Sequence, residues 1–342
     1  MVKTALLLMT LRVFGSAGAE SQLTPANESS ALNPGNIGRV PLQTNVADVS
    51  TFFEATPESK RWKARVKLRG SSSDRGSDSI ALGEAFVQMK AASWLDVTAG
   101  RVIEKWGTGY GWTPTAFVGP RRNPTDPNDR RSEYRGADMI RADAFVDDTT
   151  ISVYAFGGGS FAARAYRLIG GTDVALHVRD SRVGLSLSRV FGEALELHGE
   201  IARDAGAARA VAGGQYTFVN DTNIVLEIYH ATDGLTHSEW SSFLDSIDHD
   251  LQDANAHYAP LRMARTYTFG RLSRDFGKTN GEVIAIANLR DGSAIVRAAV
   301  SHKLRPSLSV YVIDTEFTGS NGSELSLMQV SRVVTAGVRV YF

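Results

Sequence analysis

The sequence predicts an all-β protein, specifically a transmembrane antiparallel up-and-down β-barrel of about 16 strands, within a range of 14–18. Three observations support this: an alternating C-terminal segment that ends in an aromatic residue, alternating segments that recur along the chain, and connections that are long at one end only. A β-sandwich would show the same alternation of side chains, but it predicts no such asymmetry of loop lengths.

The C-terminal segment VVTAGVRVYF alternates strictly between apolar and other residues. Because the side chains of a strand alternate between its two faces, one face can meet lipid and the other water. The segment resembles the closing strand of bacterial outer-membrane proteins, whose terminal Phe and alternating apolar residues are read by the barrel-assembly machinery. We therefore predict a membrane-assembly signal at Phe342, Val340 and Val338, with that machinery and outer-membrane lipid as partners.

The N-terminal residues predict a secretory signal peptide over 1–19. Lys3 supplies a positive charge, residues 5–9 are apolar, and Ala17 and Ala19 form an A-x-A cleavage site, although Arg12 interrupts the apolar stretch. Residues 20–58 are predicted to be an extended periplasmic lead-in, with an extra strand at 44–56 as the alternative. The barrel is then expected over 59–342, in the outer membrane of a Gram-negative cell after cleavage near Ala19.

Sixteen alternating segments supply the predicted strands. They lie near 59–69, 79–90, 94–104, 136–147, 149–157, 161–169, 173–180, 183–190, 194–203, 208–218, 223–231, 261–272, 281–290, 293–303, 307–317 and 329–342. If the first segment runs outward, the loops at 70–78, 105–135, 232–260 and 318–328 all lie outside and the tight turns lie inside. Among the residues expected to face lipid are Leu197, Ile201, Leu226 and Ile228.

Composition narrows the choice of function. The 37 basic residues balance the 37 acidic ones, so nothing points to a nucleic-acid partner. The mean hydropathy is −0.15. Past the N-terminal segment no apolar run is long enough for a spanning helix, but a barrel needs none, since only alternate residues face lipid. The chain has no cysteine, which excludes disulfides and thiolate metal sites.

The first predicted strand carries five cations on one face. Each would cost about 2–4 kcal/mol at the membrane midplane, so all five are expected to line a wet lumen. Neighbouring strands offer acidic partners, which leaves two interpretations: a stripe that selects for anions, or a wall of cross-strand ion pairs with no selective role. The pore-lining candidates on these strands are Arg61, Lys63, Arg65, Lys67, Arg69, Glu84, Asp96 and Glu104.

The most distinctive local feature is the segment from Arg101 to Asp143. It joins Gly100-Arg101 and a Lys-Trp-Gly at 105–107 to a loop with Asn-Pro at 123–124 and Asp-Pro at 126–127. This resembles porin-type barrels of the alginate-export and similar uncharacterised outer-membrane families, closely over about a third of the chain. The resemblance implies a channel or export pore and names no substrate.

The long loop at 105–135 carries Arg121 and Arg122, two further pore-lining candidates. It could fold into the mouth and narrow the pore, or form a solvated outer cap whose charges satisfy one another. The glycines at 107, 109 and 111 suggest a phosphate loop only superficially, because no helix follows them. Trp106 and Trp112 are expected at the outer membrane interface.

Enzymatic interpretations find little support, so no catalytic residue, metal or cofactor is predicted. Gly-x-Ser-x-Gly is absent, and Glu196, His198 and Glu200 share a strand face more simply as lumen lining than as a metal site. A helix is predicted near 238–251, over an outer opening or against the rim. The expected function is a porin-like channel for passive diffusion or export of small polar or anionic solutes, in a monomer or homotrimer. The alternative is a non-conducting barrel that serves adhesion or envelope organisation.

Overall fold

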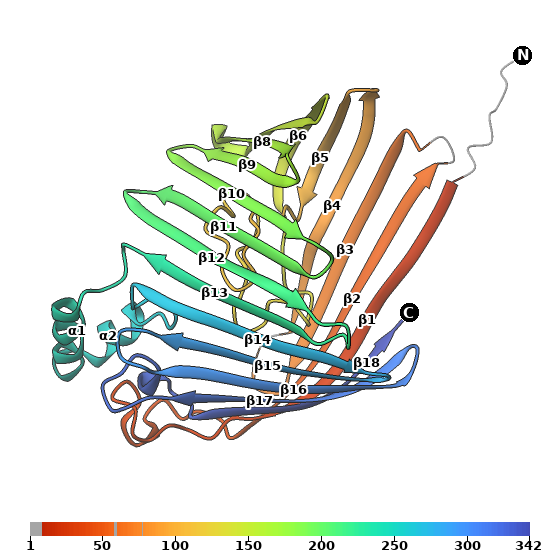
Figure 1. The fold of residues 1–342 in the computed structure, drawn as a ribbon. Coiled ribbons are helices and arrows are strands. Elements are labelled where there is room, and N and C mark those ends of the chain that lie inside the picture. The colour runs from red at the N-terminus through yellow and green to blue at the C-terminus, as the bar shows by residue number, and fades with distance from the viewer. Residues whose placement is uncertain (1–8, 58–59, 77) are drawn as a thin grey trace, which may run out of the picture.

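The computed structural model describes residues 9–57, 60–76 and 78–342. Its 18 strands form one antiparallel sheet in which each strand pairs with its neighbours in sequence. The sheet closes into a barrel because β1 also pairs with β18 (Figure 1). The predicted fold class is confirmed, with the strand number at the upper limit of the predicted range.

The strands, in chain order, are β1 (Met9–Leu23), β2 (Gln43–Pro57), β3 (Trp62–Ser73), β4 (Ser79–Ala92), β5 (Leu95–Val102), β6 (Ala137–Val146), β7 (Thr149–Phe156), β8 (Phe161–Ile169), β9 (Thr172–Arg179), β10 (Arg182–Phe191), β11 (Leu195–Asp204), β12 (Ala207–Thr217), β13 (Asn223–Ala231), β14 (Thr266–Phe276), β15 (Thr279–Asn288), β16 (Ala294–Arg305), β17 (Leu308–Thr318) and β18 (Arg332–Tyr341). Each of the sixteen predicted segments overlaps one of the strands β3 to β18, with ends that differ by up to five residues.

The two additional strands come from the first 58 residues. Residues 43–57 form β2, so about half of the lead-in expected over 20–58 is barrel wall and the alternative strand at 44–56 is the better description. Residues 9–19 of the expected signal peptide lie in β1, and residues 1–8 lie outside the described residues. Arg12 pairs with Glu54 in the strand register, so its charge fits a strand whose other face carries the exposed Leu11 and Val13. Cleavage near Ala19 is an untested alternative to this arrangement, because it would remove most of the strand that pairs with β2 and β18.

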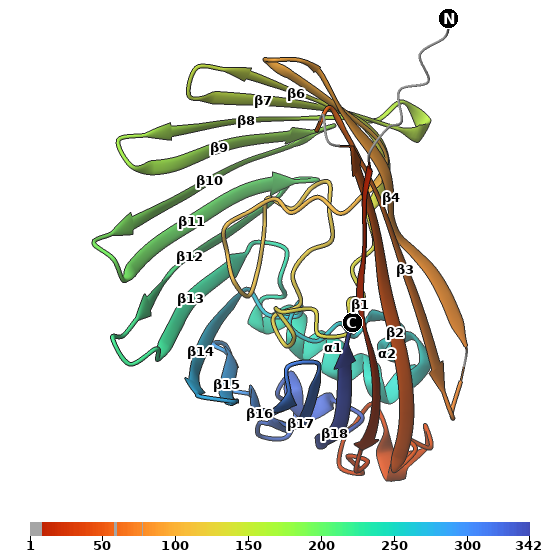
Figure 2. The same cartoon turned by 90° about the vertical axis from the view of Figure 1, so that its right-hand side faces the viewer.

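The two ends of the barrel differ in the length of their connections. At one end, here called the long-loop end, the chain crosses between strands through residues 24–42, 103–136, 232–265 and 319–331. At the opposite end, the turn end, several connections are only two residues long, at 93–94, 147–148, 170–171, 277–278 and 306–307. Figure 2 shows the contrast, and the predicted asymmetry of the loops is confirmed.

The wall has an apolar outer face and a polar inner face. Leu197, Ile201, Leu226 and Ile228 are exposed on the outside, as predicted. The neighbour of Leu226 in the chain, Glu227, is only 4% exposed because it points into the lumen. The alternation along each strand therefore separates a lipid-facing surface from a charged interior.

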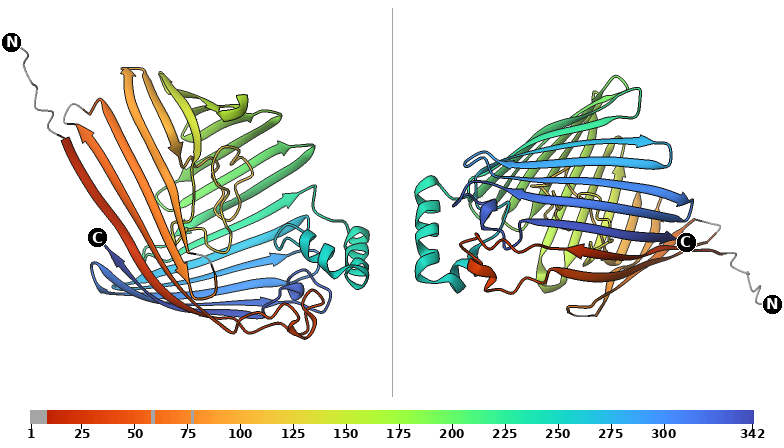
Figure 3. Two further views of the ribbon diagram at one scale, coloured as in Figure 1. Left: turned by 180° about the vertical axis from the view of Figure 1, so that it is seen from behind. Right: turned by 90° about the horizontal axis from the view of Figure 1, so that it is seen from below.

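Two helices cover part of the long-loop end. They are α1 (His237–His249) and α2 (Leu251–His257), and they confirm the helix predicted near 238–251. Thr236 caps α1 through a reciprocal pair of hydrogen bonds with Glu239. Trp240 and Leu32 belong to one buried cluster. The helices lie beside the β1–β2 connection (Figure 3). None of the described helices is both long and apolar enough to span a membrane.

The last residue takes part in closing the barrel. The Phe342 amide donates to the Gly15 carbonyl at 3.1 Å, and the Gly15 amide donates to the Phe342 carbonyl at 2.7 Å. The aromatic ring shares the exposed outer face with Val338 and Val340. The face expected from the alternation is therefore present, whereas its role as an assembly signal stays a prediction.

Deleting Phe342 is expected to lower the yield of assembled barrel. The deletion removes two backbone hydrogen bonds at the seam between β1 and β18, each worth about 0.5–1.5 kcal/mol net. The measurement is the fraction of protein whose mobility in SDS gels shifts on heating. Phe342→Trp keeps the backbone and an aromatic ring, so it is expected to assemble normally. An unchanged yield from the deletion would contradict the prediction.

Candidate functional site

The connection between β5 and β6, residues 103–136, turns into the barrel instead of away from it. We call this segment the inner loop, and Figure 2 shows it crossing the lumen. Its residues Thr115, Phe117 and Val118 are buried inside the wall. Of the two arrangements considered for this loop, the structure has the inward one.

The first anchor of the inner loop is the carboxylate of Glu200 on β11. Its Oε1 accepts from the backbone amides of Thr108 at 2.6 Å and Gly109 at 2.7 Å. Its Oε2 accepts from the amide of Thr115 at 2.9 Å and from the hydroxyl of the same residue at 2.7 Å. Hydrogen bonds to a carboxylate are about twice as strong as those between neutral groups. Glu200 therefore holds two parts of the loop with one side chain.

Glycine lets the backbone approach this carboxylate. Gly107 has a φ of +94°, and a Cβ there would lie 2.6 Å from Glu200 Oε1. A Cβ on Gly109 would lie 1.9 Å from the Trp112 carbonyl oxygen. Only glycine fits both positions without a shift of the surrounding atoms. The glycine-rich stretch thus does surround an anionic group, and that group is a side chain of the barrel wall.

The second anchor is Glu227 on β13. It accepts from the backbone amides of Tyr110 and Gly111, the latter at 2.7 Å. Its Oε1 also lies 2.7 Å from His198 Nε2, and His198 Nδ1 lies 3.0 Å from Glu196. One histidine is therefore held between two carboxylates, and one of those carboxylates holds the inner loop.

Aromatic rings fill the space between the inner loop and the wall. Trp106 is 2% exposed and packs edge-on against Phe117 and Tyr154. Trp112 stacks on Tyr229, with ring centroids 5.0 Å apart. The expected interfacial position of both tryptophans is wrong, because the loop that carries them folds into the lumen, where Trp106 is buried and Trp112 is partly buried.

The second half of the inner loop is tied to strands on the other side of the barrel. Arg130 and Arg131 form ion pairs with the fully buried side chain of Glu20 on β1. The Tyr311 hydroxyl, from β17, also donates to Glu20 at 2.7 Å. On β3, Arg69 pairs with Glu133 of the loop at 3.1 Å. The loop is thus braced between distant parts of the wall.

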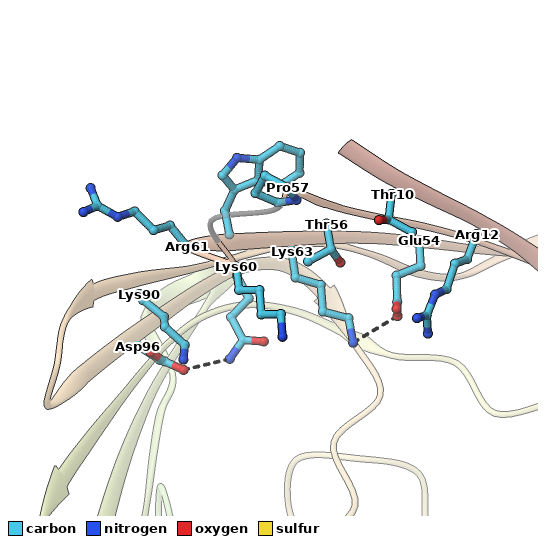
Figure 4. A pocket seen from close by; sticks show the side chains of 12 residues that line it. Thr10, Arg12, Glu54, Thr56, Pro57, Lys60, Arg61, Lys63, Lys90 and Asp96 are labelled. Atoms are coloured by element: carbon cyan, nitrogen blue, oxygen red, sulfur yellow. Dashed lines mark hydrogen bonds and ion pairs between the residues drawn. The ribbon is translucent and has the colours of Figure 1, made fainter. Parts of the chain in front are cut away.

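Four of the five cations predicted to share one face lie on β3, and most of them have partners, whereas Arg61 precedes the strand and its side chain turns away (Figure 4). Glu54 on β2, which sequence analysis did not single out, lies 2.9 Å from Lys63 and 2.7 Å from Arg65. Lys67 is buried and donates to the Tyr134 carbonyl at 3.3 Å. This face is therefore a network of ion pairs and loop contacts more than a free stripe of positive charge.

The three acidic candidates have separate surroundings. Glu84 lies 3.9 Å from Arg65 and accepts from the Ile103 amide. Asp96 accepts from the side chain of Gln88 at 3.2 Å. Glu104 pairs with Arg141 at 2.5 Å, which makes it part of the base of the inner loop. Only Glu84 partners the β3 cations in the way that was expected.

A cavity of about 570 Å³ opens at the turn end of the lumen, below β1 to β5. Figure 4 shows Lys60, Lys63 and Arg12 pointing into it around Glu54, while the Arg61 side chain turns away from the group. Five basic and two acidic side chains line this cavity. At this mouth of the lumen basic side chains therefore outnumber acidic ones.

The trio of Glu196, His198 and Glu200 does not form a metal site. His198 bridges the carboxylates of Glu196 and Glu227, and Glu200 is occupied by the inner loop. Within the described residues no group of three or more His, Cys, Asp or Glu side chains is arranged to hold a metal ion.

No family model and no curated protein matches this sequence. Solved structures do match it. One, described as "Asymmetric conductivity of engineered proteins", aligns with a TM-score of 0.56 at 13% identity, over 97% of this chain and 100% of the other. A triple mutant of the Rhodopseudomonas blastica porin aligns over the same shares of both chains with a TM-score of 0.55 and 13% identity.

The chain has the fold of a porin. At this identity the likeness establishes the fold alone. The more specific resemblance to alginate-export barrels, drawn from the segment around Trp106, stays a prediction. The inner loop lies inside the barrel, so its position sets the width and charge of any path through the lumen.

Proposed function

We propose that this barrel is a porin-like channel of the Gram-negative outer membrane. Small polar solutes, anions preferentially, would pass through it by diffusion or export along their gradient. The observation that carries the proposal is the charged lumen, inside which the inner loop is held by hydrogen bonds to the wall. The cavity at the turn end of this lumen has more basic than acidic side chains. A polar lumen inside an apolar wall is the design of a water-filled channel.

The test is the zero-current potential of the purified protein in a planar bilayer under a KCl gradient. We expect a sign that favours chloride, and a shift toward zero in the variant that carries Lys60→Gln and Lys90→Gln. Both residues line the turn-end cavity, and the Debye length of about 8 Å at physiological salt means that their fields act on an ion inside it. Lys278→Gln, in the β14–β15 turn, is the matched control and should leave the potential unchanged. A pore that favours potassium would contradict the anion preference.

A second candidate function is a non-conducting barrel that displays its outer loops. It is favoured by the number of hydrogen bonds and ion pairs that fix the inner loop in the lumen. Absence of conductance from protein that shifts on heating in SDS gels would select this alternative.

Orientation can be tested on whole cells. If the long-loop end faces outward, added trypsin is expected to cut near the exposed Arg262 and Arg265, between α2 and β14. It should spare Arg130 and Arg131, because the inner loop lies within the wall. The same digestion of heat-denatured protein, as the control, should cut at all four. Cutting confined to the turn end would reverse the proposed orientation.

We also propose three kinds of partner: the barrel-assembly machinery, outer-membrane lipid and further copies of this chain. The exposed apolar face of β18 would be recognised by the barrel-assembly machinery, and outer-membrane lipid would surround the wall. Assembly as a homotrimer is tested by the native mass of the detergent-extracted protein.

A further inference from the structure

Four arginines from three separate segments surround one cavity at the long-loop end. Arg121 and Arg122 belong to the inner loop, Arg209 lies on β12, and Arg262 lies between α2 and β14. The cavity measures about 330 Å³, close to the lower end of the range for small-molecule sites, about 300–1,000 Å³. It lies at the opposite end of the barrel from the cavity in Figure 4.

The positive charge of this cavity is incompletely balanced. Asp204 lies 3.3 Å from Arg121 and 3.2 Å from Arg209, and Arg209 also pairs with Asp233. Within the part of the chain that the structure describes, neither Arg122 nor Arg262 forms an ion pair with a carboxylate. No acidic residue lines the cavity itself. Burial, and then the neighbouring charge of Arg209, lower the pKa of Arg121.

Apolar and stiff groups form the part of the wall that the arginines leave. They include the ring of Tyr229, stacked against Trp112, together with Pro124, Pro260 and Leu261. Prolines have a fixed φ, and the two stacked rings support each other, so the walls are preorganised. An inorganic anion would contact the arginines and leave these surfaces without a partner.

We propose that this cavity binds a small organic anion, a carboxylate attached to one flat hydrocarbon ring. The guanidinium groups bind the carboxylate in their fork geometry, and the ring lies against the apolar wall. This inference rests on the proposed function, because the cavity would then bind transported solutes near the long-loop end of the channel.

The test is isothermal titration of the detergent-folded protein with benzoate, which requires no conductance. We expect benzoate to bind, benzamide to bind far more weakly because it lacks the charge, and inorganic phosphate to bind more weakly because it lacks the ring. Losing one hydrogen bond to a charged group should weaken benzoate binding about tenfold, so Arg262→Gln and Arg122→Gln are each expected to show that change. Lys60→Gln, at the opposite mouth, should bind benzoate as the unchanged protein does.

Several outcomes would overturn the assignment. Equal affinity for benzoate and phosphate would show that the apolar wall does not recognise a hydrocarbon ring. If the arginine variants bound benzoate as tightly as the unchanged protein, the binding site would lie elsewhere. No binding of benzoate by protein that shifts on heating in SDS gels would refute the site altogether.

Bilayer recordings separate this inference from the proposed function. We expect benzoate added on the long-loop side to interrupt the chloride current, and Arg262→Gln to shorten the interruptions. A conducting pore that benzoate does not affect would contradict a solute-binding site in the transport path and would leave the proposed channel function supported. Binding without any conductance would leave the site standing and refute the channel.

Discussion

Replacing Glu200 with Gln is expected to release the first half of the inner loop from the wall. The carboxylate accepts four hydrogen bonds, and the amide would turn an NH2 group toward two of those four donors. At about 1.5–3 kcal/mol for each bond to a charged group, the loss is roughly 3 kcal/mol or more, which raises the population of the released loop about a hundredfold. We expect a larger and noisier conductance, together with new cleavage by chymotrypsin after Tyr110 and Trp112.

Glu196→Gln is the matched control for this change. Glu196 lies on the same strand and the same face as Glu200. It contacts His198 and Ser188 but, among the described residues, forms no hydrogen bond to the inner loop. It should therefore leave the chymotrypsin pattern as it is. Unchanged conductance and cleavage in Glu200→Gln would mean that the aromatic packing around Trp106 holds the loop without this anchor.

Removing residues 9–19 is expected to abolish the barrel. β1 pairs with β2 from Met9 to Leu23 and with β18 from Ser16 to Leu23, so the deletion takes away most of the strand that joins the two edges of the sheet. The exposed edges would carry unpaired backbone groups, which a membrane does not tolerate. The truncated protein should neither resist SDS nor shift in mobility on heating.

A longer deletion elsewhere provides the control. Removing residues 237–257 takes out α1 and α2 but leaves every strand pairing intact, so the mobility shift on heating should remain.

N-terminal sequencing of protein extracted from the outer membrane tests cleavage near Ala19 directly. A mature chain that begins at residue 20 and still forms an SDS-resistant barrel would show that β1 is dispensable.

The wall was largely predictable from the sequence because its information is local. Each strand from β3 to β18 alternates over eight or more residues, and alternation alone assigns both the strand and its faces. β1 was assigned differently because an apolar run and an A-x-A motif satisfy the pattern of a signal peptide. In the barrel the same Arg12 that interrupts that pattern sits on the lumen face opposite Glu54.

The candidate site was less predictable because its contacts join residues far apart in sequence. Glu200 and Thr108 are 92 positions apart, and Glu20 and Arg131 are 111 apart. No period along the chain encodes such a pair. A weak signal did exist, since three glycines in five residues show that the backbone approaches something closely, but the sequence does not say what.

The inner loop has ties to β1, β3, β11, β13 and β17, and this has a consequence for biogenesis. Glu20 and Tyr311 come together only when β1 pairs with β18, so the contacts that hold Arg130 are complete only after the barrel has closed. Chain closure over such a span is entropically costly and slow. A newly made chain would then hold a sheet with two open edges and an undocked loop, which is the state most prone to aggregation. Docking of the inner loop would end this aggregation-prone state. In the finished barrel the same contacts stabilise the β1–β18 pairing against opening.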